Sequence, residues 1–322
     1  MLSRTLLAAV VLTFTTSSQG LLTTASKDST GRYAYNFATI PFLAECLKLC
    51  ISTFLLSRQH HGVSDRPRYS LSWKGTSLFL PPSVLYWFHN NVQFLTLKYL
   101  DTATYQILGN LKILTTGLLF WACLGRRLTP LQWISLLLLA IGITTSQVSV
   151  SSAAQFIAPL QGYLWSIASA FVSALAAIYT EWVMKRNSDS LYWQNMQLYS
   201  FGIVLNGMGL IIGDIRSIAG HSSLWPRHLF RGYNGVTFLL VANLAFSGLL
   251  VSWIMKYADS IVKVFATSMA MLVTTLVSVA AFGLQPSLQM ILGMTTASIS
   301  LILYYMGPSL VKLPDSPLKL PK

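Results

Sequence analysis

The residues of this chain that could do chemistry are polar side chains placed inside long apolar stretches. Lys112 lies about ten residues into the apolar stretch 102–123, which holds no carboxylate that could neutralise it. Tyr105, Gly109 and Lys112 follow one another at i, i+4 and i+7, so they share one face of a helix. The tyrosine ring, the space left by the glycine and the lysine cation lie on one face, and together they suit a ligand with a flat base and an anionic group, such as a nucleotide. The alternative is a structural ion pair between Lys112 and Glu45 of another stretch.

A second lysine inside an apolar stretch is Lys263, which shares a helix face with Thr267 one turn later. Two lysines in a low-dielectric cavity would offset much of the desolvation cost of a ligand with two negative charges. The alternative for Lys263 is a place at the end of its helix, where a lysine reaches the polar surface of a membrane.

Two further polar pairs stand at helical spacing. Glu45 and Lys48 are three residues apart and can pair on one helix face. They either neutralise each other and lock the helices together, or contact a ligand. Tyr86 and Asn90 are four residues apart, and Asn91 follows directly. This cluster predicts a ligand or gate role, with hydrogen bonds between helices as the alternative.

Single polar residues occur at Tyr199 and Asn206, seven residues apart on one predicted helix. Each is either a ligand contact or a hydrogen bond that connects two helices. Glu181 stands four residues before Lys185, and this spacing predicts an ion pair near a helix end.

The elements that position these residues are apolar helices. The chain is 53% hydrophobic and only 10% charged, whereas a soluble domain has about 25% charged residues. Because lipid cannot satisfy an open backbone, stretches of about 20 apolar residues predict an all-α polytopic membrane protein with ten transmembrane helices. The first stretch could instead be a cleaved signal peptide that ends near Gly20, but a retained helix is favoured because it allows a five-plus-five division. The ten stretches are roughly 3–25, 37–57, 76–97, 102–123, 129–149, 160–184, 191–212, 235–255, 261–283 and 287–307.

An internal echo supports that division. The segment 98–102 (KYLDT) returns as 256–260 (KYADS), 158 residues later, each time between two apolar stretches. The alternative is a chance match, but such a repeated segment is typical of a duplicated unit. We therefore predict five-helix repeats over 1–150 and 151–310, followed by a cytosolic tail over 311–322. With five helices in each, the second repeat is inverted relative to the first, an architecture typical of alternating access.

The charge distribution indicates orientation and excludes other classes. The net charge of +13 resides mainly in short connections: thirteen of the 22 lysines and arginines fall on the side of the termini and six on the other. Both termini are therefore expected in the cytosol, and no nucleic-acid partner is expected. The three cysteines form neither a disulfide framework nor a zinc site, and no metal or cofactor is expected. An enzyme is disfavoured because the stretches hold no paired acids and no nucleophile triad; a membrane scaffold would not need lysines at mid-membrane.

The order of these polar residues resembles that of the Golgi nucleotide-sugar transporters. Within that family the likeness is greatest to the CMP-sialic acid transporter group in its plant form, and it runs through nearly the whole chain. The segments that carry it are Tyr86-x3-Asn90-Asn91-x2-Phe94, Leu100-Asp101-x-Ala103-x-Tyr105-Gln106, Leu111-Lys112, Leu131-Gln132-Trp133, Phe42-x2-Glu45-x2-Lys48 and Tyr257-x-Asp259-x-Ile261-x-Lys263.

The resemblance implies a drug/metabolite-transporter fold in the Golgi membrane that exchanges cytosolic nucleotide sugar for luminal nucleoside monophosphate, here CMP. A carrier of UDP-galactose or UDP-N-acetylglucosamine on the same fold is the alternative. It also implies roles for the polar residues. The base and ribose would be held by Tyr86, Asn90 and Tyr105, the phosphate by Lys112 and Lys263, and the sugar end would be lined by Glu45 and Lys48.

One position departs from the family pattern. Relatives often carry a tyrosine where this chain has Gly109, which implies a differently shaped sugar pocket. Sialic acid is also not an ordinary plant sugar, so the sugar itself is left open, and no feature of the sequence indicates an oligomeric state.

Overall fold

A computed structural model describes residues 2–26, 33–62, 69–97, 99–100, 102–147, 159–218, 230–282 and 287–310. Within these ranges the chain forms twelve helices and no strand. They are α1 (Leu2–Ala25), α2 (Thr39–Gly62), α3 (Trp73–Ser77), α4 (Leu80–Leu97), α5 (Thr102–Gly109), α6 (Leu111–Leu124), α7 (Pro130–Gln147), α8 (Leu160–Arg186), α9 (Leu191–Ile218), α10 (Gly235–Tyr257), α11 (Ser260–Phe282) and α12 (Leu288–Leu310).

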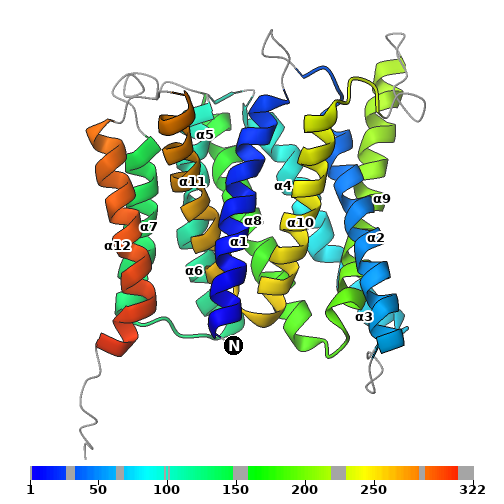
Figure 1. The fold of residues 1–322 in the computed structure, drawn as a ribbon, viewed down its shortest axis with the longest axis horizontal. Coiled ribbons are helices and arrows are strands. Elements are labelled where there is room, and N and C mark those ends of the chain that lie inside the picture. The colour runs from blue at the N-terminus through cyan, green and yellow to red at the C-terminus, as the bar shows by residue number, and fades with distance from the viewer. Residues whose placement is uncertain are drawn as a thin grey trace, which may run out of the picture.

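The all-helical prediction is confirmed. The long helices stand side by side in one slab, and the short α3 lies at its edge (Figure 1). Eight segments of the described chain are long and apolar enough to cross a membrane. The other two predicted stretches are occupied by α4 and α7, which cross the same slab (Figure 1). The chain is thus a multi-pass membrane protein, and the predicted tail 311–322 lies outside the described residues.

One predicted helix is interrupted. The stretch 102–123 is divided at Asn110 into α5 and α6. There the Asn110 amide donates to the carbonyl of Ile107, only three residues back, so the chain tightens for one turn. Tyr105 therefore lies on α5 and Lys112 on α6. The single helix face predicted for these residues is broken between them.

The described residues of the two repeated segments lie at different faces of the slab. The side that holds the N-terminus and the end of α12 is called the terminal face here (Figure 1). The connection from α4 to α5, at Tyr99 and Leu100, lies at the opposite face, and the connection from α10 to α11, at Ala258 and Asp259, lies at the terminal face (Figure 1). This is the placement that an inverted duplication predicts. The repeat boundaries themselves stay a prediction.

The first helix is part of the bundle. α1 packs against α10 and α11, and Leu12 is completely buried there. The Thr13 hydroxyl donates to the carbonyl of Ala266 at 3.0 Å, and the Asn243 amide donates to the carbonyl of Thr15 at 2.8 Å. These contacts favour the interpretation of this segment as a retained helix over that of a signal peptide.

α7 and α12 touch through their backbones. A Cβ atom added at Gly293 of α12 would lie 2.4 Å from the amide nitrogen of Ser146, and one added at Gly142 of α7 would lie 2.6 Å from that of Ala297. Small residues permit such an approach, and close packing is a main attraction between helices in lipid.

A valine at Gly293 is therefore expected to push α7 and α12 apart. Overpacking of this kind costs about 1–3 kcal/mol, so the thermal unfolding temperature in detergent should fall clearly. Gly235→Val is the matched control, because a Cβ at Gly235 meets nothing within 4 Å. Equal unfolding temperatures for the two variants would contradict the proposed contact.

Candidate functional site

A cavity of about 440 Å³ lies inside the bundle, within the range of small-molecule sites, about 300–1,000 Å³. Its walls come from α1, α2, α4, α8, α9, α10 and α11. Seven of the residues predicted for a site line it: Glu45, Lys48, Tyr86, Asn90, Tyr199, Asn206 and Lys263. Four do not: Tyr105, Gly109, Lys112 and Thr267.

The predicted pair of Glu45 and Lys48 is formed inside this cavity. Lys48 Nζ lies 2.5 Å from Glu45 Oε1, and both side chains are largely buried. Two glycines make room for the charges: a Cβ atom at Gly202 would lie 2.9 Å from Glu45 Oε2, and one at Gly248 would lie 2.8 Å from Lys48 Cδ. The pair neutralises itself and also lines the cavity, so the first interpretation is confirmed and contact with a ligand stays a prediction.

Tyr199 and Asn206 differ in what they bond to. The Tyr199 hydroxyl lies 2.7 Å from the Ser252 hydroxyl and so connects α9 to α10, while Lys48 Nζ sits 4.3 Å from the centre of the Tyr199 ring. Asn206 donates to the carbonyl of Gly202, one turn earlier on its own helix. Both line the cavity, but only Tyr199 connects two helices through the bonds found.

Lys263 points into the bundle and not toward a lipid interface. Its Nζ lies 3.5 Å from the Tyr86 hydroxyl and 5.5 Å from the centre of the Tyr86 ring. Asn90 stands one turn after Tyr86 on α4 and lines the same cavity. The cation, the ring and the amide come together from α4 and α11, which the sequence could not place side by side.

Lys112 lies next to this cavity, in a second polar group. Its charge interacts with that of Lys263, and both lysines interact with His89 of α4. No ion pair to Lys112 is found within the described residues, and Glu45 pairs with Lys48. The alternative of a structural pair between Lys112 and Glu45 is therefore wrong.

Tyr105 belongs to the same second group. Its hydroxyl is hydrogen-bonded to the side chain of Ser169 on α8, which also contacts His89. Gly109 faces open space, since a Cβ atom added there meets nothing within 4 Å. The Thr267 hydroxyl donates to the carbonyl of Lys263 on its own helix.

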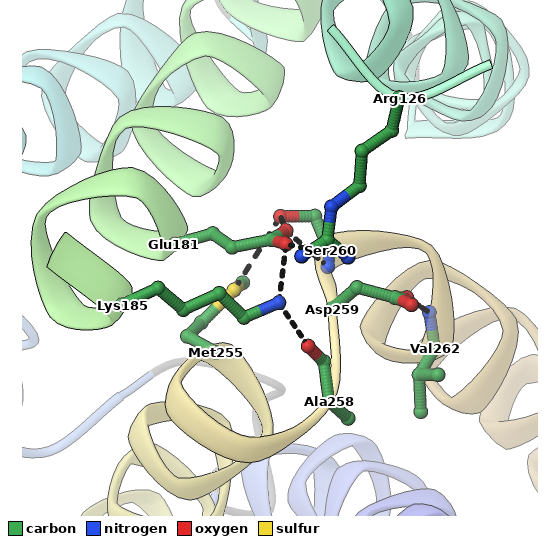
Figure 2. A network of polar contacts seen from close by, with 8 residues as sticks. All are labelled: Arg126, Glu181, Lys185, Met255, Ala258, Asp259, Ser260 and Val262. Carbon is green, nitrogen blue, oxygen red and sulfur yellow. Dashed lines mark hydrogen bonds and ion pairs between the residues drawn. The ribbon is translucent and has the colours of Figure 1, made fainter. Parts of the chain in front are cut away.

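A buried network lies at the terminal face, and sequence reasoning found only its Glu181–Lys185 pair and missed the other contacts (Figure 2). Glu181 of α8 is completely buried. One of its oxygens accepts hydrogen bonds from the Ser260 amide at 2.7 Å and the Ser260 hydroxyl at 2.6 Å. The other lies 2.7 Å from Lys185 Nζ, as the spacing predicted, and 3.9 Å from the Arg126 guanidinium.

The network holds the α10–α11 connection against α8. Lys185 also donates to the carbonyl of Ala258, and the Asp259 carboxylate accepts from the Val262 amide at 2.8 Å (Figure 2). Burial raises the pKa of the Asp259 carboxyl, although the bond from the Val262 amide acts in the opposite direction. The carboxylates of Glu181 and Asp259 thus accept hydrogen bonds from backbone amides in the first turn of α11. These amides have no partner within the helix, so the bonds stabilise its start.

The cavity ends just above this network. Thr180, the residue before Glu181, lines its floor, whereas Gln19, Thr23, Ile40 and other lining residues belong to the ends of α1 and α2 at the opposite face. The cavity therefore extends toward the opposite face, and the Glu181 network lies between it and the terminal face.

Comparison with known proteins places this site in a family. The family model described as "Nucleotide-sugar transporter" matches residues 3–305. "CMP-sialic acid transporter 1" of Oryza sativa subsp. japonica is 52% identical over 315 residues, 96% of this chain and 97% of that protein. "CMP-sialic acid transporter 1" of Arabidopsis thaliana is 53% identical over 312 residues, 95% of this chain and 91% of that protein.

More distant similarities agree. "Probable UDP-sugar transporter protein SLC35A4" of Danio rerio is 34% identical over 280 residues, 83% of this chain and 85% of that protein. One solved crystal structure superposes with a TM-score of 0.69 over 94% of this chain and 98% of its own, at 16% identity, and so bears on the fold alone. The resemblance carried by the polar motifs is confirmed, and the chain belongs to the nucleotide-sugar transporter family.

Proposed function

We propose that this protein exchanges a cytosolic CMP-sugar of the CMP-sialic acid type for luminal CMP by alternating access. The observation that carries this proposal is the approach of two lysines inside the bundle: Lys263 contacts Tyr86, and Lys112 is close enough to Lys263 for the two charges to interact. The names of the most similar relatives support the choice of CMP-sialic acid.

The charges suit such a ligand. Because Glu45 and Lys48 neutralise each other, Lys112 and Lys263 leave an excess of two positive charges near the cavity. A CMP-sugar acid carries two negative charges, one on the phosphate and one on the carboxylate. Like charges at short distance repel strongly in a low dielectric, so an anion placed between the lysines relieves their repulsion.

The base would be held by aromatic and amide groups. Stacking of a base on a ring such as Tyr86 or Tyr105 contributes about 1–3 kcal/mol. Asn90 offers both a donor and acceptors to a base edge. The pair of Glu45 and Lys48 lines the same cavity from α2, where it would face the sugar. No metal or other cofactor is needed in this scheme.

Alternating access would come from the two predicted repeats, residues 1–150 and 151–310. The cavity extends toward the opposite face while the Glu181 network lies between it and the terminal face. With both termini in the cytosol, as the charge bias favours, this conformation would face the lumen. Together with the Golgi location implied by the resemblance, it would be the state that receives CMP.

A UDP-sugar carrier is the second candidate. It is favoured by the similarity to the Danio rerio protein, whose name refers to a UDP-sugar. An asparagine amide can also pair with uracil, because it holds a donor and an acceptor.

Counterflow tests the proposal against this alternative. Vesicles that contain the purified protein are preloaded with CMP, UMP or GMP and given labelled CMP-sialic acid or UDP-galactose. We expect accumulation of CMP-sialic acid in CMP-loaded vesicles and little in the others, because one site must accept both exchanged species. Empty vesicles are the control. Preference for UMP with UDP-galactose would establish the second candidate, and no accumulation of either sugar would contradict both.

A further inference from the structure

His89 is a titratable side chain beside the two lysines to which the transport scheme gives no task. It lies on α4, three residues after Tyr86, so both side chains share a helix face. Lys263 contacts Tyr86 on that face. The His89 ring is half-buried, and the next residue in the chain, Asn90, lines the cavity.

The hydrogen bonds found for His89 within the described part of the chain involve Nδ1, and none involves Nε2. Nδ1 lies 2.8 Å from the hydroxyl oxygen of Ser169 and 3.1 Å from the Ser169 carbonyl oxygen. Since a carbonyl can only accept, Nδ1 carries a hydrogen and donates. A neutral imidazole with hydrogen on Nδ1 has its lone pair on Nε2. A further proton must therefore enter at Nε2.

Two charges are found to interact with His89 among the described residues, and both are positive. Lys112 from α6 and Lys263 from α11 interact with it, and α8 contributes the uncharged Ser169. From α5 comes Tyr105, which is bonded to Ser169. α9 also packs against α4 but adds no charge to the interactions found for His89 in the described residues. A proton on Nε2 would be a third cation beside two, which is unfavourable while the site is empty.

We propose that His89 takes up one proton from solvent at Nε2 when a nucleotide phosphate binds between Lys112 and Lys263. This inference rests on the proposed function, because it requires the anion at that place. The phosphate lowers the net positive charge beside His89, so the cost of protonating the imidazole falls, and the imidazolium adds a donor to the anion site. Binding of the nucleotide and binding of the proton are then linked.

The sign of the pH effect follows from this linkage. The complex holds more protons than the free protein plus free ligand, so a lower pH favours the complex. In the pH range where His89 is neutral in the free protein and protonated in the complex, the affinity for the nucleotide rises by up to about tenfold for each unit by which the pH is lowered. The protein would therefore hold a nucleotide more tightly on the more acidic side of the membrane.

The test is calorimetric titration of the full chain in detergent with the methyl ester of CMP. This phosphodiester does not titrate near neutral pH, whereas the phosphate of CMP does. Measurement at pH 7 in two buffers of different ionisation enthalpy gives the number of protons taken up. We expect uptake approaching one proton per bound ligand, and a dissociation constant that falls between pH 8 and pH 6.

His89→Gln is the variant that assigns the proton, since glutamine retains a donor for the Ser169 carbonyl but cannot be protonated. We expect proton uptake to be lost and the dependence of affinity on pH to flatten. Ser169→Ala removes the hydroxyl that contacts His89 but retains the imidazole, so proton uptake should persist in this variant. The comparison separates the effect of losing a hydrogen bond from the effect of losing the titratable group. Uptake in His89→Gln equal to that of the wild type would overturn the assignment.

The wild type alone can refute the idea, even if His89→Gln does not fold. Tight binding of the CMP methyl ester without proton uptake would overturn the role of His89 and leave the transport proposal intact. No binding of either CMP or its methyl ester would instead overturn the nucleotide site, and the His89 proposal with it.

Discussion

Lys112→Ala is expected to abolish CMP binding while leaving the fold intact. The side chain is a cation without an ion pair in the described part of the chain, and its charge faces that of Lys263. Removal of the Lys112 charge therefore relieves its repulsion with Lys263 in the empty protein. In the complex, it removes the attraction between Lys112 and the phosphate of CMP. Loss of one partner of a buried charge pair costs about 2–5 kcal/mol, so affinity should fall by roughly 30-fold to several thousand-fold. Titration of detergent-purified protein with CMP measures this.

The control is Lys74→Ala, because Lys74 lies on the short α3, outside the cavity lining. This variant should bind CMP as the wild type does. The Lys112→Ala protein should unfold at a temperature no lower than that of the wild type, which separates loss of a ligand contact from loss of fold. Unchanged CMP affinity in Lys112→Ala would refute the assignment of the phosphate to this lysine.

Glu181→Ala is expected to have the largest effect on stability. The carboxylate is fully buried, binds both the amide and the hydroxyl of Ser260, and pairs with Lys185. Removal of one partner of a buried ion pair costs about 3–5 kcal/mol. Because Lys185 and Arg126 can still reach water, with side-chain exposures of 24% and 50%, we expect about 3 kcal/mol. The thermal unfolding temperature in detergent should drop accordingly.

Glu181→Gln divides this effect into two parts. Glutamine can still accept the bonds from Ser260, but it offers no charge to Lys185 and Arg126, so its loss should be smaller than that of alanine. Lys185→Ala should lie between the wild type and Glu181→Ala, since Arg126 stays near the carboxylate. An unfolding temperature of Glu181→Ala within error of the wild type would show that the network does not hold the α10–α11 connection in place.

The number and place of the membrane helices could be predicted because lipid leaves the backbone no other choice. Each apolar stretch had to become a helix, and the structure differs mainly at Asn110, where one stretch becomes α5 and α6. That break depends on a single tightened turn, which leaves no trace in hydropathy.

Pairs within one helix could also be predicted, because helix geometry alone brings residues three or four apart together. Glu45 with Lys48 and Glu181 with Lys185 are both formed. The sequence thus predicts two properties of each site: which polar side chains lie inside the membrane, and which of them share a helix face.

The contacts between helices were decided by the tertiary structure alone. Lys263 contacts Tyr86, which is 177 residues away in the sequence, and Glu181 binds Ser260, which is 79 residues away. Such contacts depend on the rotation and crossing of each helix, which close packing at small residues determines: Gly202 makes room for Glu45 and Gly248 for Lys48. Chain spacing carries no information on that rotation, so only the packed bundle could assemble the cavity and the Glu181 network.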